Sequence, residues 1–319
     1  MQTRTSQLPG LFHMDADAHA AERNAPVPAG PTRPARGPCL ELCVLGSGSG
    51  GNSSVIRVAG RCILIDAGFG PRTIFKRLEM AGVDPDGLHD VLVTHLDRDH
   101  LRPNLLPILL ERRIRLHLHR WHLPDLQRLE AAERLASEGL VHCFDFEPFE
   151  LPEGDVRVRP VALPHDLKGT VGFRIETSVG SVGYATDLGQ VPEALIEAMT
   201  GADLVAIESN YDPGLQRSSG RPVFLQRRIM GMAGHLSNEQ SFATVQKVLD
   251  RSPPGLPQHV VLLHVSRQCN HVGIIRQVFE ADARLKGRLT LSGQRRRSRW
   301  LKVQPLKPLG RRQMPLMFR

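Results

Sequence analysis

The chain has 319 residues, of which 41% are apolar and 23% are charged, and this ordinary globular composition excludes a wholly disordered chain. No apolar run is long enough to cross a bilayer and no signal peptide is evident, so we expect a cytoplasmic protein without membrane association. The five cysteines are scattered and form no CxxC pair, which argues against both a disulfide framework and a cysteine zinc site.

The formal net charge of +8 is unevenly distributed. The segment from Lys286 to the C-terminus holds eleven Lys and Arg and no Asp or Glu, so the remainder of the chain carries −3. The run Arg295–Arg299, and later Arg311-Arg312, could bind phosphates while Trp300 stacks on a base. A solvated, mobile terminus explains such a run equally well. We predict a basic C-terminal tail over residues 294–319.

The predicted strands and helices begin after an N-terminal arm. Residues 1–37 are rich in Ala, Pro, Arg and Gly and show no sustained apolar period, which predicts a disordered N-terminal arm. A folded domain is expected over residues 38–293. The expected strands are residues 40–45, 55–58, 62–66, 91–94, 156–163, 171–175, 181–185, 204–208 and 260–264, and the expected helices are residues 74–80, 192–199, 223–230, 238–249 and 273–283.

The order of these elements predicts the fold class. Strands first come in hairpin-like pairs and later alternate with helices, which predicts two sheets with helices packed outside. This is an α/β (α+β) protein with a four-layer αββα sandwich. Residues 113–120 alternate in a way that predicts a strand with a basic exposed face, and we therefore leave His117, His119 and His122 out of the site.

The segment Thr94-His95-Leu96-Asp97-Arg98-Asp99-His100 has four metal-capable side chains within six residues, directly after an apolar strand. Taken alone, this segment could also be a polar turn in which Asp99 caps the next helix, although a metal site explains it better. Four further metal-capable residues also end or follow predicted strands: Asp66, His165, Asp187 and His264. Because strand ends face open loops, this pattern indicates one common site.

These residues carry a family resemblance. The pattern His95-x-Asp97-x-Asp99-His100, preceded by Asp66-Ala67-Gly68, resembles the metallo-β-lactamase superfamily over roughly residues 40–293. Five further stretches resemble its YycJ/WalJ-type subgroup, which is regarded as containing DNA exonucleases or phosphodiesterases. They are residues 46–53, 184–189, 207–210, 234–238 and 264–266.

The resemblance implies a metallo-β-lactamase sandwich that holds two divalent metal ions. One ion would be held by His95, Asp97 and His165, and the other by Asp99, His100 and His264, with Asp187 bridging and Asp66 orienting. The family has a histidine where this chain has Asp97, and an anionic oxygen moves metal preference from zinc towards manganese or iron. Asp97 binds the metal directly, binds it through water, or leaves the first site weak.

The implied activity is metal-dependent phosphodiester hydrolysis, in which Asp99 and Asp187 orient a metal-activated bridging hydroxide. His235 is the candidate proton donor, and Glu208 would raise its pKa, as in ribonuclease-Z-like members. The alternatives are a polar helix-start residue for His235 and a surface charge at a strand end for Glu208.

The predicted enzyme is a DNA exonuclease whose basic tail helps to hold the polymer. Two other functions remain open from the sequence. One is hydrolysis of a small ester, thioester or lactone. The other is a nucleic-acid-binding regulatory protein with a damaged site.

Overall fold

The computed structural model describes residues 39–152 and 155–305. The predicted arm over residues 1–37 and the basic pair Arg311-Arg312 lie outside the described residues. Within the described part of the chain, no helix combines the length and apolar character needed to cross a bilayer.

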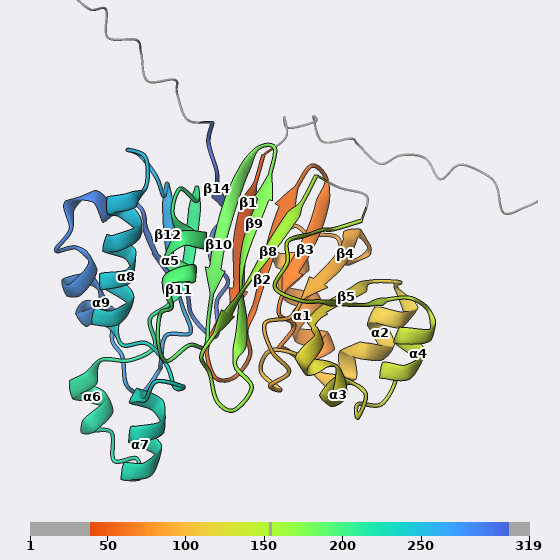
Figure 1. The fold of residues 1–319 in the computed structure, drawn as a ribbon, viewed down its shortest axis with the longest axis horizontal. Coiled ribbons are helices and arrows are strands. Elements are labelled where there is room, and N and C mark those ends of the chain that lie inside the picture. The colour runs from red at the N-terminus through yellow and green to blue at the C-terminus, as the bar shows by residue number, and fades with distance from the viewer. Residues whose placement is uncertain (1–38, 153–154, 306–319) are drawn as a thin grey trace, which may run out of the picture. The chain divides into compact units, whose positions relative to one another are not determined.

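Two seven-stranded sheets form the centre of the fold (Figure 1). The first has the order β14-β1-β2-β3-β4-β5-β6 and the second has the order β13-β12-β11-β10-β9-β8-β7. The strands are β1 (Glu41–Gly46), β2 (Ser53–Val58), β3 (Arg61–Ile65), β4 (Leu88–Leu92), β5 (Arg115–His119), β6 (Val141–Phe144), β7 (Phe149–Glu150), β8 (Arg157–Leu163), β9 (Thr170–Thr177), β10 (Gly180–Ala185), β11 (Leu204–Glu208), β12 (His259–Leu263), β13 (Leu289–Leu291) and β14 (Leu301–Lys302).

Helices cover the outer face of each sheet. The first sheet is covered by α1 (Pro71–Met80), α2 (Leu106–Glu111), α3 (Leu123–Leu126) and α4 (Ala132–Ser137). The second is covered by α5 (Glu193–Met199), α8 (Asn238–Arg251) and α9 (Val272–Phe279). The helices α6 (Pro213–Arg217) and α7 (Val223–Met230) lie together beyond the strand ends, at the lower left of Figure 1.

Side-chain alternation along the strands produces three apolar layers. In β1, Leu42 and Val44 pack between the sheets, whereas Cys43 and Leu45 pack under the outer helices. In β11, Leu204 and Ala206 face the other sheet, whereas the side chains between them face α5 and α8. Successive side chains of a strand point to opposite faces, so strands covered on both faces read as continuous apolar runs. The αββα prediction is confirmed.

The prediction of a basic exposed face over residues 113–120 was wrong. β5 lies inside the first sheet between β4 and β6, and both His117 and His119 are buried. The His117 Nε2 atom lies 2.8 Å from a carboxylate oxygen of Asp90, and Arg115 binds the same carboxylate at 2.7 Å. The basic residues of this alternating segment therefore belong to a buried cluster in which Arg115 and His117 bind Asp90.

The first part of the predicted tail belongs to the first sheet. β14 pairs antiparallel with β1, and Ser298 donates its backbone N–H to Val44 at 2.8 Å. Trp300 packs against the outer core, donates its indole N–H to Ala81 at 2.9 Å, and lies under the Arg57 guanidinium. The prediction that Trp300 stacks on a base was therefore wrong, because its ring already packs within the protein.

Candidate metal centre

The predicted site residues come together because several parallel strands end at one edge. β3 runs parallel to β4, and β10, β11 and β12 run parallel to one another. The carboxyl ends of parallel strands lie at the same edge, where loops can form a crevice. A cavity of about 370 Å³ opens there. The predicted residues that line it are His95, Asp97, Asp99, His165, Asp187, His235 and His264.

Three strand-end residues have left-handed backbone. The φ angles are 61° at Asp66, 54° at Asp187 and 50° at His264. Residues other than glycine seldom adopt this region, although Asp, Asn and His adopt it more often than the rest. Such non-glycine residues cluster at functional sites, where surrounding contacts hold them in place.

Gly68 explains why the Asp66-Ala67-Gly68 strand end lies beside the histidine motif. Ala67 donates its backbone N–H to His100 at 2.6 Å, which ties the two segments together. A Cβ atom on Gly68 would lie 1.7 Å from the backbone oxygen of Asp99. Any larger residue would displace the loop that carries the motif.

One group of potential ligands contains His95, Asp97 and His165, whose ligand atoms all lie within 4.8 Å of one another. The His165 Nδ1 atom lies 2.9 Å from the backbone oxygen of Gly234, which leaves Nε2 available as a ligand atom. Burial and the neighbouring His100 lower the pKa of His95 well below its ordinary value, so this ring is neutral. A neutral imidazole is the form that binds a metal.

Asp187 links the other predicted ligands. Its Oδ2 atom lies 3.1 Å from His100 Nε2 and its Oδ1 atom lies 2.8 Å from His264 Nδ1. Asp99 is more distant, with Oδ2 3.9 Å from His100 Nε2. Burial alone would lower the pKa of His264, but Asp187 and Glu208 raise it to about 10. Burial likewise opposes the charge on His100, but Asp66 and Asp187 raise its pKa well above the ordinary value. Both rings would therefore have to release a proton in order to bind a cation.

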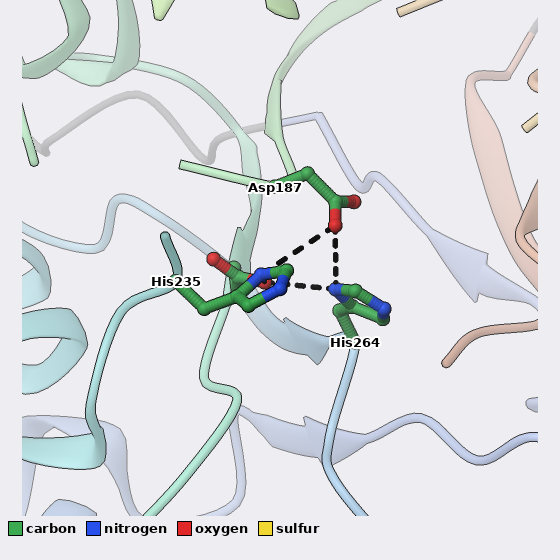
Figure 2. Close-up of side chains that lie close together, drawn as sticks. Asp187, His235 and His264 are labelled. Carbon is green, nitrogen blue, oxygen red and sulfur yellow. Dashed lines mark hydrogen bonds and ion pairs between the residues drawn. The ribbon is translucent and has the colours of Figure 1, made fainter. Parts of the chain in front are cut away.

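A second compact group contains Asp187, Glu208, His235 and His264, again with ligand atoms within 4.8 Å (Figure 2). The His235 Nδ1 atom lies 2.8 Å from Glu208 Oε1 and 3.5 Å from Asp187 Oδ1. Glu208 is completely buried, and its other oxygen accepts the backbone N–H groups of Leu188 and Leu236. The alternative of a surface strand-end charge for Glu208 was therefore wrong.

The local alternatives for Asp99, as a helix cap, and for His235, as a polar residue at a helix start, also do not describe this site. The helix after His235 is capped by Ser237, which forms a reciprocal capping box with Gln240. The turn after the motif leads into a short 3₁₀ helix whose N-cap is Arg102, not Asp99. Asp99 is therefore not a cap, and His235, which lies just before the Ser237 cap, pairs with Glu208.

The chemistry of the donor set fits divalent cations. Asp187 and Glu208 both bring a carboxylate oxygen to within 2.8 Å of the same His264 nitrogen, inside the protein. Buried carboxylates are costly unless positive charge or hydrogen bonds compensate them. Imidazole nitrogens with carboxylate oxygens are donors that suit zinc, manganese and iron.

Two polar side chains, one on each ring nitrogen, contact His100. Asp66 Oδ2 lies 2.7 Å from His100 Nδ1, and Asp66 also accepts hydrogen bonds from the Thr94 hydroxyl and backbone N–H. A carboxylate behind a ligating histidine fixes the ring orientation and raises its basicity. Sequence reasoning missed Asn52, whose Nδ2 lies 2.9 Å from His100 Nε2. Its place near the end of the Gly-rich loop, which we define as residues 46–54, was the available signal.

Sequence reasoning also missed two arginines that line the same cavity, Arg221 and Arg228. Arg221 donates to the amide oxygens of Gln268 at 3.0 Å and Gln216 at 3.3 Å. Because these partners are neutral, they orient the guanidinium without cancelling its charge. Arg228 pairs with Asp166 at 2.7 Å. No motif in the sequence pointed to either residue.

Comparison with known proteins identifies the family. The model of the β-lactamase superfamily domain matches residues 61–265. The chain belongs to this superfamily. It is a hydrolase with the metallo-β-lactamase fold, as the sequence predicted.

Two bacterial proteins are similar to this chain in sequence, and one solved structure is similar to it in fold. The exodeoxyribonuclease WalJ of Streptococcus pneumoniae serotype 2 is 26% identical over 252 residues, which is 76% of this chain and 90% of WalJ. The exodeoxyribonuclease YycJ of Bacillus anthracis is 23% identical over 249 residues, or 78% of this chain and 90% of YycJ. The metallo-β-lactamase fold protein YhfI of Bacillus subtilis superposes with a TM-score of 0.59 at 15% identity, over 83% of this chain and 99% of that structure.

Asp97 gives a prediction about metal choice in this superfamily member. We expect Asp97→His to raise the zinc content relative to manganese and iron, because a nitrogen ligand replaces a hard oxygen. Metal analysis by mass spectrometry of both proteins, purified from identical cultures, measures the change. Asp145→His, at an exposed position, controls for an added surface histidine. Identical metal identity and content in the Asp97→His protein and the wild type would contradict direct ligation.

Proposed function

We propose that the protein is a metal-dependent phosphodiesterase that removes nucleotides from DNA ends, with two divalent cations at the centre described above. The observation that carries the proposal is the cavity itself. It places a cationic Arg221 and a carboxylate-paired His235 beside the cluster of potential metal ligands. A phosphodiester needs an anion-binding group and a proton for its leaving alkoxide. The names of the relatives WalJ and YycJ support DNA as the substrate.

His95, Asp97 and His165 would hold one cation, and Asp99, His100 and His264 would hold the other, with Asp187 between them. Cations bound there would activate the attacking water, neutralise the phosphate charge and stabilise the entering and leaving oxygens. Asp66 and the Gly234 carbonyl fix the rings of His100 and His165. The protein therefore supplies rigid donors and little conformational change is needed at the centre.

Two residues beside the centre bind the phosphate and protonate the leaving group. Arg221 binds a nonbridging phosphate oxygen, because its charge is held in the cavity by neutral amides. The Nδ1 atom of His235 is engaged by Glu208, so Nε2 is the atom that donates a proton. The water oxygen joins phosphorus and the water gives up a proton to solvent, the bond from phosphorus to the sugar oxygen breaks, and the proton from His235 completes the released alcohol. His235 then regains a proton from solvent.

A second candidate function has one supporting observation. A neighbouring cavity of about 820 Å³ shares His95, Asp97 and His165 with the first, and its lining includes Leu96 and the fully exposed Leu167. An apolar surface beside the centre would suit the acyl group of a small ester, thioester or lactone.

The test uses the purified protein with Mn²⁺, Zn²⁺ or chelator. The substrates are bis(4-nitrophenyl) phosphate, end-labelled linear DNA, circular DNA and a nitrophenyl ester. We expect metal-dependent hydrolysis of the phosphodiester and of linear DNA, release of mononucleotides from an end, and no cutting of the circle. Hydrolysis of the ester alone would favour the second candidate. No turnover of any phosphodiester with any metal would overturn the proposal.

A further inference from the structure

A cavity of about 600 Å³ lies between α1 and the segment before β14, and its lining is strongly basic. The lining residues are Arg72, Thr73, Lys76, Arg77, Met80, Arg295, Arg296 and Arg297. We propose that this basic cavity binds the phosphate backbone of a nucleic acid strand, at a distance from the bond that is hydrolysed. The inference rests on the proposed function, since it names where the rest of the polymer lies.

Among the residues that the structure describes, the positive charge of the basic cavity is not neutralised by a carboxylate. Its lining contains six Lys and Arg and no Asp or Glu, and within residues 39–152 and 155–305 none of the six forms an ion pair with a carboxylate. Arg77 illustrates this, because its guanidinium donates to the backbone oxygens of Leu45 and Gln294 and lies over the Phe69 ring. Like charges gathered on one wall repel one another, and they attract a polyanion from solution.

The basic run is held in position, so the cavity has a defined shape. On one side of the run, Gln294 accepts a hydrogen bond from Arg77. On the other side, Ser298 bonds to β1, Trp300 packs on the outer core and β14 joins the sheet. A flexible tail would lose conformational entropy when it bound a strand, whereas a fixed run has already lost most of it.

One loop separates the basic cavity from the metal centre. The Gln294 side chain accepts the Gly50 backbone N–H at 2.7 Å and donates to the Gly51 backbone oxygen at 2.9 Å. Ser49, the residue before Gly50, lines the cavity of the metal centre. A strand whose end lies at the centre therefore has only the Gly-rich loop to cross before it meets Arg295 and Arg72.

The test compares two double variants, Arg72→Gln/Lys76→Gln and Arg295→Gln/Arg296→Gln, with the wild type, all metal-loaded. The four side chains that are changed are exposed, so both variants should fold, and thermal unfolding checks this. Fluorescence anisotropy with a labelled phosphorothioate single strand measures Kd across a salt series. The logarithm of the association constant falls as the logarithm of the salt concentration rises. Each lost phosphate contact should make this negative slope shallower by about 0.7. We expect each double variant to bind about tenfold more weakly and to hydrolyse bis(4-nitrophenyl) phosphate at the wild-type rate.

The matched control is Lys247→Gln/Arg276→Gln, which removes two positive charges from α8 and α9 on the outer face of the second sheet. The inference is overturned if the basic-cavity variants keep wild-type Kd and salt slope, or if the control loses as much affinity as they do. Failure of the proposed function would look different. In that case the wild type would hydrolyse no phosphodiester, whereas the comparison of Kd values would still test the basic cavity.

Discussion

Replacement of His235 by alanine is expected to lower kcat on DNA by about 10²–10⁴-fold, which is the usual contribution of a positioned general acid. The loss should depend on the leaving group. A sugar alkoxide needs a proton as it departs, whereas the 4-nitrophenolate of bis(4-nitrophenyl) phosphate is stable without one. We therefore expect the same variant to lose less than about tenfold on the chromogenic diester. Parallel kcat measurements on the two substrates provide the comparison.

Structure limits the side effects of His235→Ala. Glu208 keeps its contacts with His264 and with the backbone N–H groups of Leu188 and Leu236, so its charge remains compensated. Metal content should therefore equal that of the wild type. His271→Ala, at the exposed start of α9, is the matched histidine control and should retain full activity. An equal loss on both substrates, or a loss of bound metal, would contradict the role of proton donor.

Replacement of Asp187 by asparagine is expected to remove bound metal as well as activity. The substitution keeps the shape of the side chain but removes the charge that lies between His100 and His264. Loss of an orienting residue outside the ligand set typically costs 10–100-fold. We therefore expect the activity of Asp187→Asn to fall by more than about 100-fold, with fewer than two metal ions per chain.

Asp166→Asn is the matched control for Asp187→Asn. Asp166 also lines the cavity and also has a left-handed φ, of 40°, but its carboxylate pairs with Arg228 on α7. Metal content by mass spectrometry and kcat on the chromogenic diester should distinguish the two variants. If Asp187→Asn retained both metal ions and wild-type kcat, Asp187 would not be the bridging ligand.

The sandwich and the cluster of predicted ligands could be derived from the sequence because local signals coincide there. Apolar runs that end in Asp or His mark buried strands whose ends converge, and the motif from His95 to His100 is contiguous. The pairing of Glu208 with His235 joins residues that are distant in sequence, and only the family resemblance suggested it. The structure shows that contact at 2.8 Å.

Three other features of the structure could not be predicted from the neighbouring sequence: the position of Arg221, the strand β14 and the burial of His117. Arg221 is oriented by Gln216 and Gln268, which lie on separate segments, so its place in the cavity depends on tertiary contacts. β14 has two residues and lies within a basic run, where composition hides a strand that exists only because β1 offers a partner. His117 is buried through its bond to Asp90 on the adjacent strand β4. For β14 and His117, charge in the sequence suggested solvent exposure, whereas pairing with a strand distant in sequence or adjacent in the sheet determined the position.

The left-handed backbone at Asp66, Asp187 and His264 is a conformational cost that the buried side chains at these positions offset. Glycine suits this conformation best, but glycine offers neither a ligand atom nor a carboxylate. The strained backbone at these positions is therefore kept together with the side chains that it carries. At Asp66, glycine would relax the backbone but would leave the buried Thr94 backbone N–H and the His100 Nδ1 atom without their carboxylate partner, so the side chain that contacts His100 also stabilises the fold.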